Sequence, residues 1–145
     1  MTAHLVCVPA SSEHILTGNK TIETRTYDIP KYLLSQGDSS VRIAILETAR
    51  GSDGVSSIPD RVKLGTNMKQ AGWMTIVRTF KYESQSHFDS DTDKHLVDPA
   101  SNYGYCDGKD MYGWVIGSKG RCPTHDQGQV FAERRMRSIF EIVAT

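Results

Sequence analysis

The sequence lacks the long apolar stretches, the even set of cysteines and the excess of one charge that mark several protein classes. No apolar run approaches the roughly 18–20 residues that a membrane-spanning helix needs, so we expect no contact with a membrane. Three cysteines cannot all pair within one chain, which favours a reducing intracellular compartment, cytoplasmic or nuclear. Basic and acidic residues balance to a net charge of zero, which argues against a strong general affinity for nucleic acid.

Familiar motifs of catalysis and cofactor binding are also missing. The chain contains no P-loop, no GxGxxG, no GxSxG and no HExxH segment. Cys122 and His125 have a spacing that metal sites use, and Cys106 is a candidate third ligand, but no CxxC and no second Cys/His pair accompany them. We therefore expect no metal and no cofactor. The start, residues 1–4, lacks the basic and apolar character of a signal peptide.

What is present fits one domain over residues 1–145. Apolar runs bounded by glycine, proline and polar residues predict about six strands, at residues 4–8, 21–25, 41–47, 73–82, 111–117 and 138–143. Helix signals are short, at residues 9–17 and 28–34 and near Val62 and His87. Without long helical crossovers the expected fold is α+β, with a mostly antiparallel sheet curled into a small barrel and short helices capping it.

The segment from Gly18 to Arg25 is the strongest functional candidate. Gly18 follows an apolar helical stretch, where glycine is the expected left-handed stop. Thr21, Glu23 and Arg25 have the same parity, so in a strand their side chains lie on one face, with Lys20 at the strand entrance. Three ionisable side chains beside a tight turn could form a site for a small polar or anionic ligand.

Each charged candidate also has a purely structural interpretation. Lys20 could bind an anion or, crowded by Arg25, act as a base, but most lysines are simply exposed. Glu23 and Arg25 could recognise a base edge and a phosphate or carbonyl oxygen, or could only form an ion pair with each other. His14, on the preceding helix, is a weaker acid–base candidate, because a histidine near a helix end often only binds a carbonyl.

Aromatic residues supply the remaining candidates. Tyr112 and Trp114 have the same parity in one predicted strand, and aromatic side chains on a sheet can stack on nucleobases. Trp114 is the stronger candidate for the core. Tyr112 and Tyr105, which lies in a turn-rich segment, are therefore the candidate stacking residues.

The segment Gly18-Asn19-Lys20-Thr21-Ile22-Glu23-Thr24-Arg25 resembles the GxKxxExR signature of the ASCH domain family. The order of the predicted elements around it is also similar, but only these eight residues are specific. The resemblance implies a PUA-like fold, a small curled β-barrel with short helices at its mouth. It also implies a cleft between barrel and helices lined by the signature residues.

The resemblance implies RNA or nucleotide binding as the function. Some bacterial relatives hydrolyse N4-acetylcytidine with the signature lysine and a threonine three residues after it, a position that is Glu23 in this chain. Others are described as ribonucleases, a role that Lys20 and His14 could support. We expect a binding domain that uses Lys20, Glu23 and Arg25. The alternatives are a hydrolase of a modified pyrimidine, a ribonuclease, or a protein-interaction module in transcription or RNA processing.

Overall fold

The computed structural model describes residues 5–9, 12–31, 40–48, 59–64, 68–98, 104–106, 108–121, 130–137 and 139–144. The chain forms two compact units. The first contains Met1–Leu16, Arg42–Met74 and Lys119–Thr145, and the second contains Thr17–Val41 and Thr75–Ser118. Two long strands, β5 (Met68–Lys81) and β6 (Tyr112–Arg121), have residues in both units, and so does β3 (Val41–Thr48), of which only Val41 belongs to the second unit.

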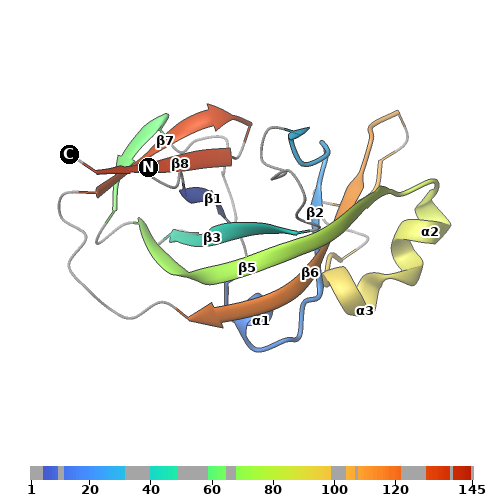
Figure 1. The fold of residues 1–145 in the computed structure, drawn as a ribbon. Coiled ribbons are helices and arrows are strands. Elements are labelled where there is room, and N and C mark those ends of the chain that lie inside the picture. Colours follow the sequence, from blue (N-terminus) through green and yellow to red (C-terminus); the bar gives the residue numbers. More distant parts are fainter. Residues whose placement is uncertain are drawn as a thin grey trace. The chain divides into compact units, whose positions relative to one another are not determined.

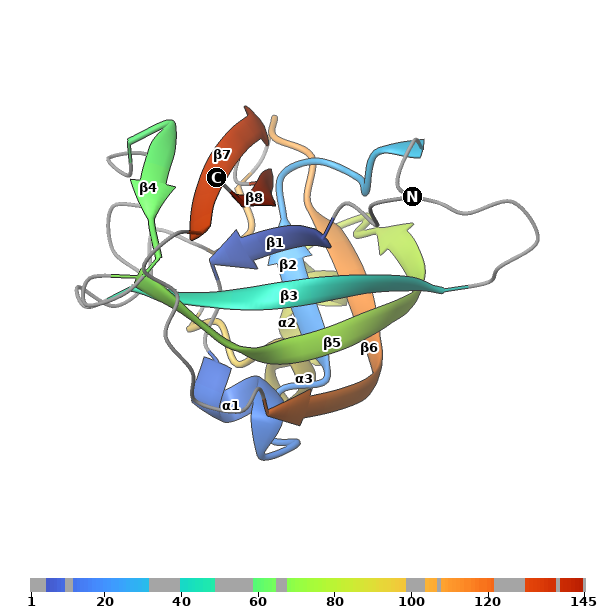
Figure 2. The same cartoon turned by 60° about the vertical axis from the view of Figure 1, so that its left-hand side comes forward.

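The first unit is built on a mixed sheet with one short helix, α1 (Ser12–Leu16). Its other strands are β1 (Leu5–Pro9), β3 (Val41–Thr48), β4 (Arg61–Lys63), β7 (Val130–Met136) and β8 (Ile139–Ala144). The hydrogen-bonded order runs β5-β3-β1-β8-β7-β4. β1 pairs with β3 in parallel, whereas the pairs β1–β8, β7–β8 and β4–β7 are antiparallel (Figure 2).

The core of the first unit centres on β3. Residues 43–46 of this strand are all fully buried, which confirms the prediction of a central strand covered on both faces. One cluster on this strand combines buried side chains from four segments: Ala44, Leu46, Leu64, Ala132 and Phe140. Ser12 at the start of α1 donates a hydrogen bond of 2.5 Å to Glu47, which fixes the helix to the end of the same strand.

The second unit contains β2 (Ile22–Arg25), the adjoining parts of β6 and β5, and two short helices, α2 (Gln85–Ser90) and α3 (Thr92–His95) (Figure 1). The order of its strands is β2-β6-β5. Ser84 caps α2, because its side chain accepts a hydrogen bond from the backbone N–H of His87. The expected short helix around His87 is therefore confirmed. The core of the second unit contains the buried side chains of Tyr82, Phe88, Val97 and Met111.

The predicted α+β class, with a mostly antiparallel sheet and few short helices, is confirmed. The predicted number of strands was too low, because the described residues also form β4 and β7. The prediction of a helix near Val62 is wrong, since Arg61–Lys63 form β4 and pair with β7. The helical turn expected at residues 28–34 lies mostly outside the described residues. No helix in the described parts of the chain is long and apolar enough to span a membrane.

Candidate ligand site

The turn that precedes the candidate site has the predicted geometry. Helix α1 ends at Leu16, and Gly18 then has φ 85°, the left-handed conformation that glycine adopts without strain. Beyond the turn, the backbone N–H of Thr21 donates to the carbonyl of Lys94 in α3 at 2.9 Å. The carbonyl of Thr21 accepts from the N–H of Ile116 in β6 at 2.9 Å. Lys20 therefore comes directly before a backbone segment held on both sides.

The pairing of β2 with β6 joins two patterns that the sequence showed separately. In this antiparallel register Glu23 lies opposite Trp114, and Arg25 lies opposite Tyr112. Side chains of directly opposed residues lie on the same face of a sheet. The polar residues of β2 and the aromatic residues of β6 therefore share one face.

Trp114 is the apolar support of this face. It is fully buried, and its indole N–H donates to the carbonyl of Tyr27 at 3.3 Å. The Tyr27 ring meets it edge-on at 5.7 Å between centroids. The Arg25 guanidinium lies 5.9 Å from the centroid of the Trp114 ring, within the range of a cation–π contact. As predicted, Trp114 is therefore a core residue and not a stacking platform.

Three charged side chains meet on this face, which we call the triad: Lys20, Glu23 and Arg25. Lys20 Nζ lies 2.8 Å from Glu23 Oε1, and Arg25 Nη2 lies 3.4 Å from Glu23 Oε2. Arg25 Nη1 also donates to the carbonyl of Thr24 at 2.9 Å. Lys20 is only 7% exposed and Glu23 only 2% exposed. The structure thus brings Lys20 and Arg25 together around the buried carboxylate of Glu23.

The charge of Glu23 is set by competition between burial and its two cationic neighbours. Burial by itself would raise the pKa of the Glu23 carboxyl. The charges of Arg25 and Lys20, with hydrogen bonds from Lys20 and from the Thr24 backbone, outweigh burial and lower this pKa below its usual value. Glu23 is therefore a carboxylate at neutral pH.

The triad carries more positive than negative charge. Two cations surround one carboxylate in a largely buried position. Glu23 Oε2 accepts no hydrogen bond from any residue that the structure describes, although the Arg25 guanidinium is nearby. A buried excess of positive charge is stabilised by an anion, and a carboxylate oxygen can still accept from an N–H or O–H group. A ligand that offered both an anionic group and an N–H or O–H donor would complement these charges.

The geometry of the triad also indicates whether a threonine hydroxyl near Lys20 could act as a nucleophile. Lys20 Nζ donates to Glu23 at 2.8 Å, so the lysine acts as a cation in an ion pair. The residue three positions after it is the buried carboxylate of Glu23. Thr21, on the other side of Ile22, is exposed, and Thr24 is partly buried. The triad is thus better arranged for binding than for an attack by a threonine hydroxyl.

The sequence patterns did not predict a buried histidine near the triad. His95, at the end of α3, is fully buried and stacks on Phe88 with 4.1 Å between ring centroids. The N–H of Val97 donates to its Nδ1 at 3.0 Å, so Nε2 carries the proton and donates to the carbonyl of Phe88 at 2.8 Å. Burial, aided by the charge of Lys20, lowers the pKa of His95 despite opposing contributions from Phe88 and Asp91.

Both ring nitrogens of His95 are therefore used within the fold, which makes it a structural residue. Nothing in the sequence signalled its burial, because the acidic segment around it has no helical or strand period.

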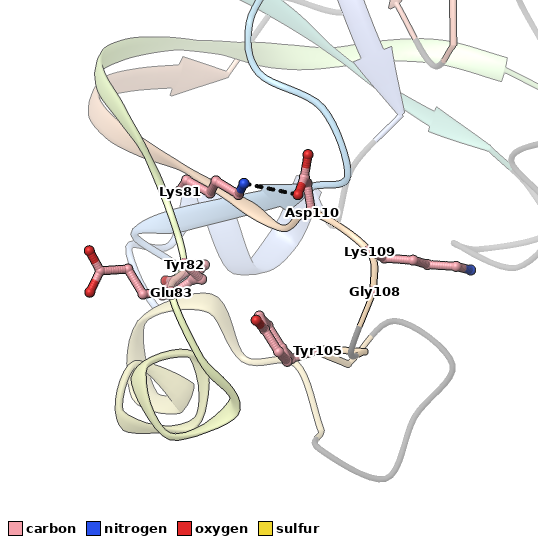
Figure 3. A pocket seen from close by; sticks show the side chains of 7 residues that line it. All are labelled: Lys81, Tyr82, Glu83, Tyr105, Gly108, Lys109 and Asp110. Carbon is pink, nitrogen blue, oxygen red and sulfur yellow. Dashed lines mark ion pairs between the residues drawn. The ribbon is translucent and has the colours of Figure 1, made fainter.

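The remaining candidates lie elsewhere. His14 is exposed on α1 of the first unit. Tyr112 is partly buried opposite Arg25, whereas Tyr105 borders a separate pocket in the second unit (Figure 3). Cys122 and His125 lie outside the described residues, and Cys106 is exposed with a free thiol. Within the described ranges no group of His, Cys, Asp and Glu side chains could hold a metal ion.

Comparison of the chain with models of known protein families found no match, and comparison with curated proteins found none either.

Proposed function

We propose that this chain is an ASCH-like domain with a PUA-like fold that binds RNA or a nucleotide through the triad. The observation that carries the proposal is the buried grouping of Lys20, Glu23 and Arg25 around a single carboxylate. For a protein with this function we expect a location in the cytoplasm or the nucleus. The eight-residue signature and the mostly antiparallel sheet support the family assignment.

The charges of the triad suggest how the ligand is held. In the proposed complex, Lys20 contacts a phosphate or a carbonyl oxygen of the nucleotide. Glu23 Oε2, which accepts no hydrogen bond from the described residues, accepts one from an amino or imino group of the base. Arg25, close to Oε2 at 3.4 Å, positions the carboxylate or takes a second oxygen of the ligand.

Tyr112 is the aromatic residue best placed to extend this site. It lies opposite Arg25 in the β2–β6 register and is only partly buried. Its ring can therefore stack on a base whose phosphate is held by the triad. Such stacking increases the affinity for the ligand and depends little on which base is bound.

Binding measurements with variants of Lys20 test the proposal. In Lys20→Met the remaining Glu23–Arg25 pair is neutral, so the fold should persist, and a melting curve checks this. We expect titration with a fluorescent single-stranded RNA or with nucleoside monophosphates to show affinity at least about tenfold weaker than that of the unaltered protein. The matched control is Lys63→Met at an exposed position of the first unit. Equal affinity for the unaltered protein and folded Lys20→Met would overturn the proposal.

The catalytic alternatives are tested with the same protein. Incubation with N4-acetylcytidine and with labelled RNA, followed by chromatography, would reveal amide hydrolysis or strand cleavage. We expect neither, since Lys20 donates to the carboxylate that occupies the position of the threonine nucleophile. Turnover that Lys20→Met abolishes would replace the binding proposal by a catalytic one.

The interaction-module alternative predicts a different outcome. If the triad only stabilises the fold, Glu23→Ala lowers the melting temperature, and folded Lys20→Met binds nucleotides and RNA no more weakly than the unaltered protein does. Binding that Lys20→Met weakens excludes that alternative.

A further inference from the structure

A pocket in the second unit is separate from the triad. It has a volume of about 480 Å³ and is lined by the end of β5 with the two residues that follow it, by Tyr105, and by residues 108–110 (Figure 3). None of the three triad residues lines it. The volume lies in the range of small-molecule sites, roughly 300–1,000 Å³.

The charges that border the pocket are balanced. Its lining includes two lysines, Lys81 and Lys109, and two acids, Glu83 and Asp110. Figure 3 shows Lys109 and Glu83 extending away from the pocket, whereas Lys81 and Asp110 border it. A site with no excess of positive charge gives no advantage to a phosphate group. Its electrostatics therefore favour a neutral ligand, unlike those of the triad.

Lys81 and Asp110 place a hydrogen-bond donor beside an acceptor. Lys81 Nζ lies 3.0 Å from Asp110 Oδ1, and both side chains are more than half exposed, at 54% and 58%. An ion pair this exposed contributes little to stability. A ligand can therefore share both partners, offering an acceptor to Lys81 and a donor to Asp110, at little cost to the fold.

Tyr105 supplies an aromatic wall that is backed by the core. It is partly buried, and its ring is tilted against Phe88 with 6.1 Å between centroids. Tyr82, which also lines the pocket, is 1% exposed and donates its hydroxyl to Asp91 at 2.9 Å, so it belongs to the core behind the pocket. A planar ligand can stack on the supported Tyr105 ring.

We propose that this pocket binds a neutral heteroaromatic ring with a lactam edge, that is, a carbonyl oxygen next to a ring N–H. The ring stacks on Tyr105, its carbonyl accepts from Lys81, and its N–H donates to Asp110. Uracil and guanine have this edge, whereas adenine has no carbonyl. The ring can belong to a free nucleoside or to a base of an RNA strand. Because the pocket excludes the triad, occupancy does not require the proposed function.

Calorimetric or NMR titration with free nucleosides tests the ligand class. We expect uridine and guanosine to bind the unaltered protein, with adenosine weaker. The matched probe 3-methyluridine keeps the ring and the carbonyls but lacks the N–H, and we expect it to lose about tenfold in affinity. Absence of nucleoside binding, or equal binding of uridine and 3-methyluridine, would overturn the inference.

Variants of the residues that line the pocket test whether uridine binds there. Tyr105→Ala and Asp110→Asn should each weaken uridine binding by about tenfold. Lys63→Ala, at an exposed position of the first unit that does not line the pocket, is the control and should leave binding unchanged. Since Asp110 is more than half exposed, Asp110→Asn is expected to fold even if Tyr105→Ala does not. If folded Asp110→Asn binds uridine as well as Lys63→Ala does, the pocket is not the site.

Two further comparisons separate this inference from the proposed function and identify the source of the ring. Lys20→Met should leave uridine binding intact while weakening the binding of phosphate-bearing ligands. A short oligouridylate that binds more tightly than uridine, and more weakly in Asp110→Asn, would assign the ring to an RNA strand. Equal affinity of uridine and the oligouridylate would assign it to a free nucleoside. If uridine binding depends on Lys20 and not on Asp110, the separate pocket is refuted.

Discussion

Glu23 lies directly opposite Trp114 in the β2–β6 ladder, and the two residues are 2% and 0% exposed. A buried carboxylate thus lies beside a buried indole, and Lys20 and Arg25 provide its charge partners. Removing a carboxylate charge from water is costly unless partners compensate it. The triad is therefore an interdependent group in which each side chain determines the environment of the others.

Removing the charge of Glu23 should be strongly destabilising. In Glu23→Gln the cations Lys20 and Arg25 remain on a buried face without their carboxylate. Breaking a buried ion pair from one side costs about 3 kcal/mol, which for a chain of this size lowers Tm by about 10 °C. Thermal unfolding followed by circular dichroism measures it. The matched control is Glu13→Gln, which breaks the exposed pair with Arg121 and should change Tm little. Similar Tm changes in the two variants would contradict this account.

Acid should remove the contribution of Glu23. Its neighbours lower its folded-state pKa below the usual value of 4.5. The stability it contributes is therefore fully present above pH 4.5 and is lost as the pH falls through the lower, folded-state pKa. Urea unfolding of the unaltered protein and of Glu23→Gln at a series of pH values should show their difference shrinking below pH 4.5. A difference that stays constant into acid would show that Glu23 is not the titrating group.

His95 should add a second pH dependence at higher pH. Burial lowers its folded-state pKa below the usual 6.5, so the unfolded chain binds the proton more readily. The stabilisation is complete above pH 6.5 and decreases as the pH falls from there towards the folded-state pKa. The unaltered protein should therefore lose more stability between about pH 7 and about pH 5.5 than His95→Gln does, since glutamine does not titrate. Parallel losses in urea unfolding would mean that His95 does not contribute.

The turn before the triad should tolerate asparagine better than alanine. Gly18 has φ 85°, where a Cβ is strained and where asparagine is the best tolerated alternative. Gly18→Ala should cost about 1 kcal/mol of unfolding free energy, and Gly18→Asn clearly less. Urea denaturation compares the two. Equal costs would show that the backbone conformation of this turn is not what selects glycine.

Local patterns predicted the elements whose signals are strong. The run at 41–47 and the glycine at position 18 were interpreted correctly because β-branched residues and left-handed turns leave marks in the sequence. Strands β4 and β7 were missed for different reasons. β4 has only three residues, and β7 contains the charged run Glu133–Arg135, which looks like a solvated segment.

The composition of the site was predictable but its surroundings were not. Parity placed Glu23 and Arg25 on one face, yet their partners Trp114 and Tyr112 are 91 and 87 residues further along the chain. Only the fold decides which distant strand pairs with β2. Similarly, the burial of His95 and the position of Tyr105 beside Lys81 and Asp110 depend on contacts that no local pattern contains.

The most direct test of the central claim is an NMR titration of the unaltered protein with uridine monophosphate or a short single-stranded RNA. Backbone amide shifts report where the phosphate-bearing ligand binds. We expect shifts at residues 20–25 and at Tyr112, and we expect the shifts at these residues to disappear in Lys20→Met and to remain in Lys63→Met, whether or not residues of the separate pocket also shift. Ligand-dependent shifts confined to other residues, or no shifts at all with the protein folded, would contradict it.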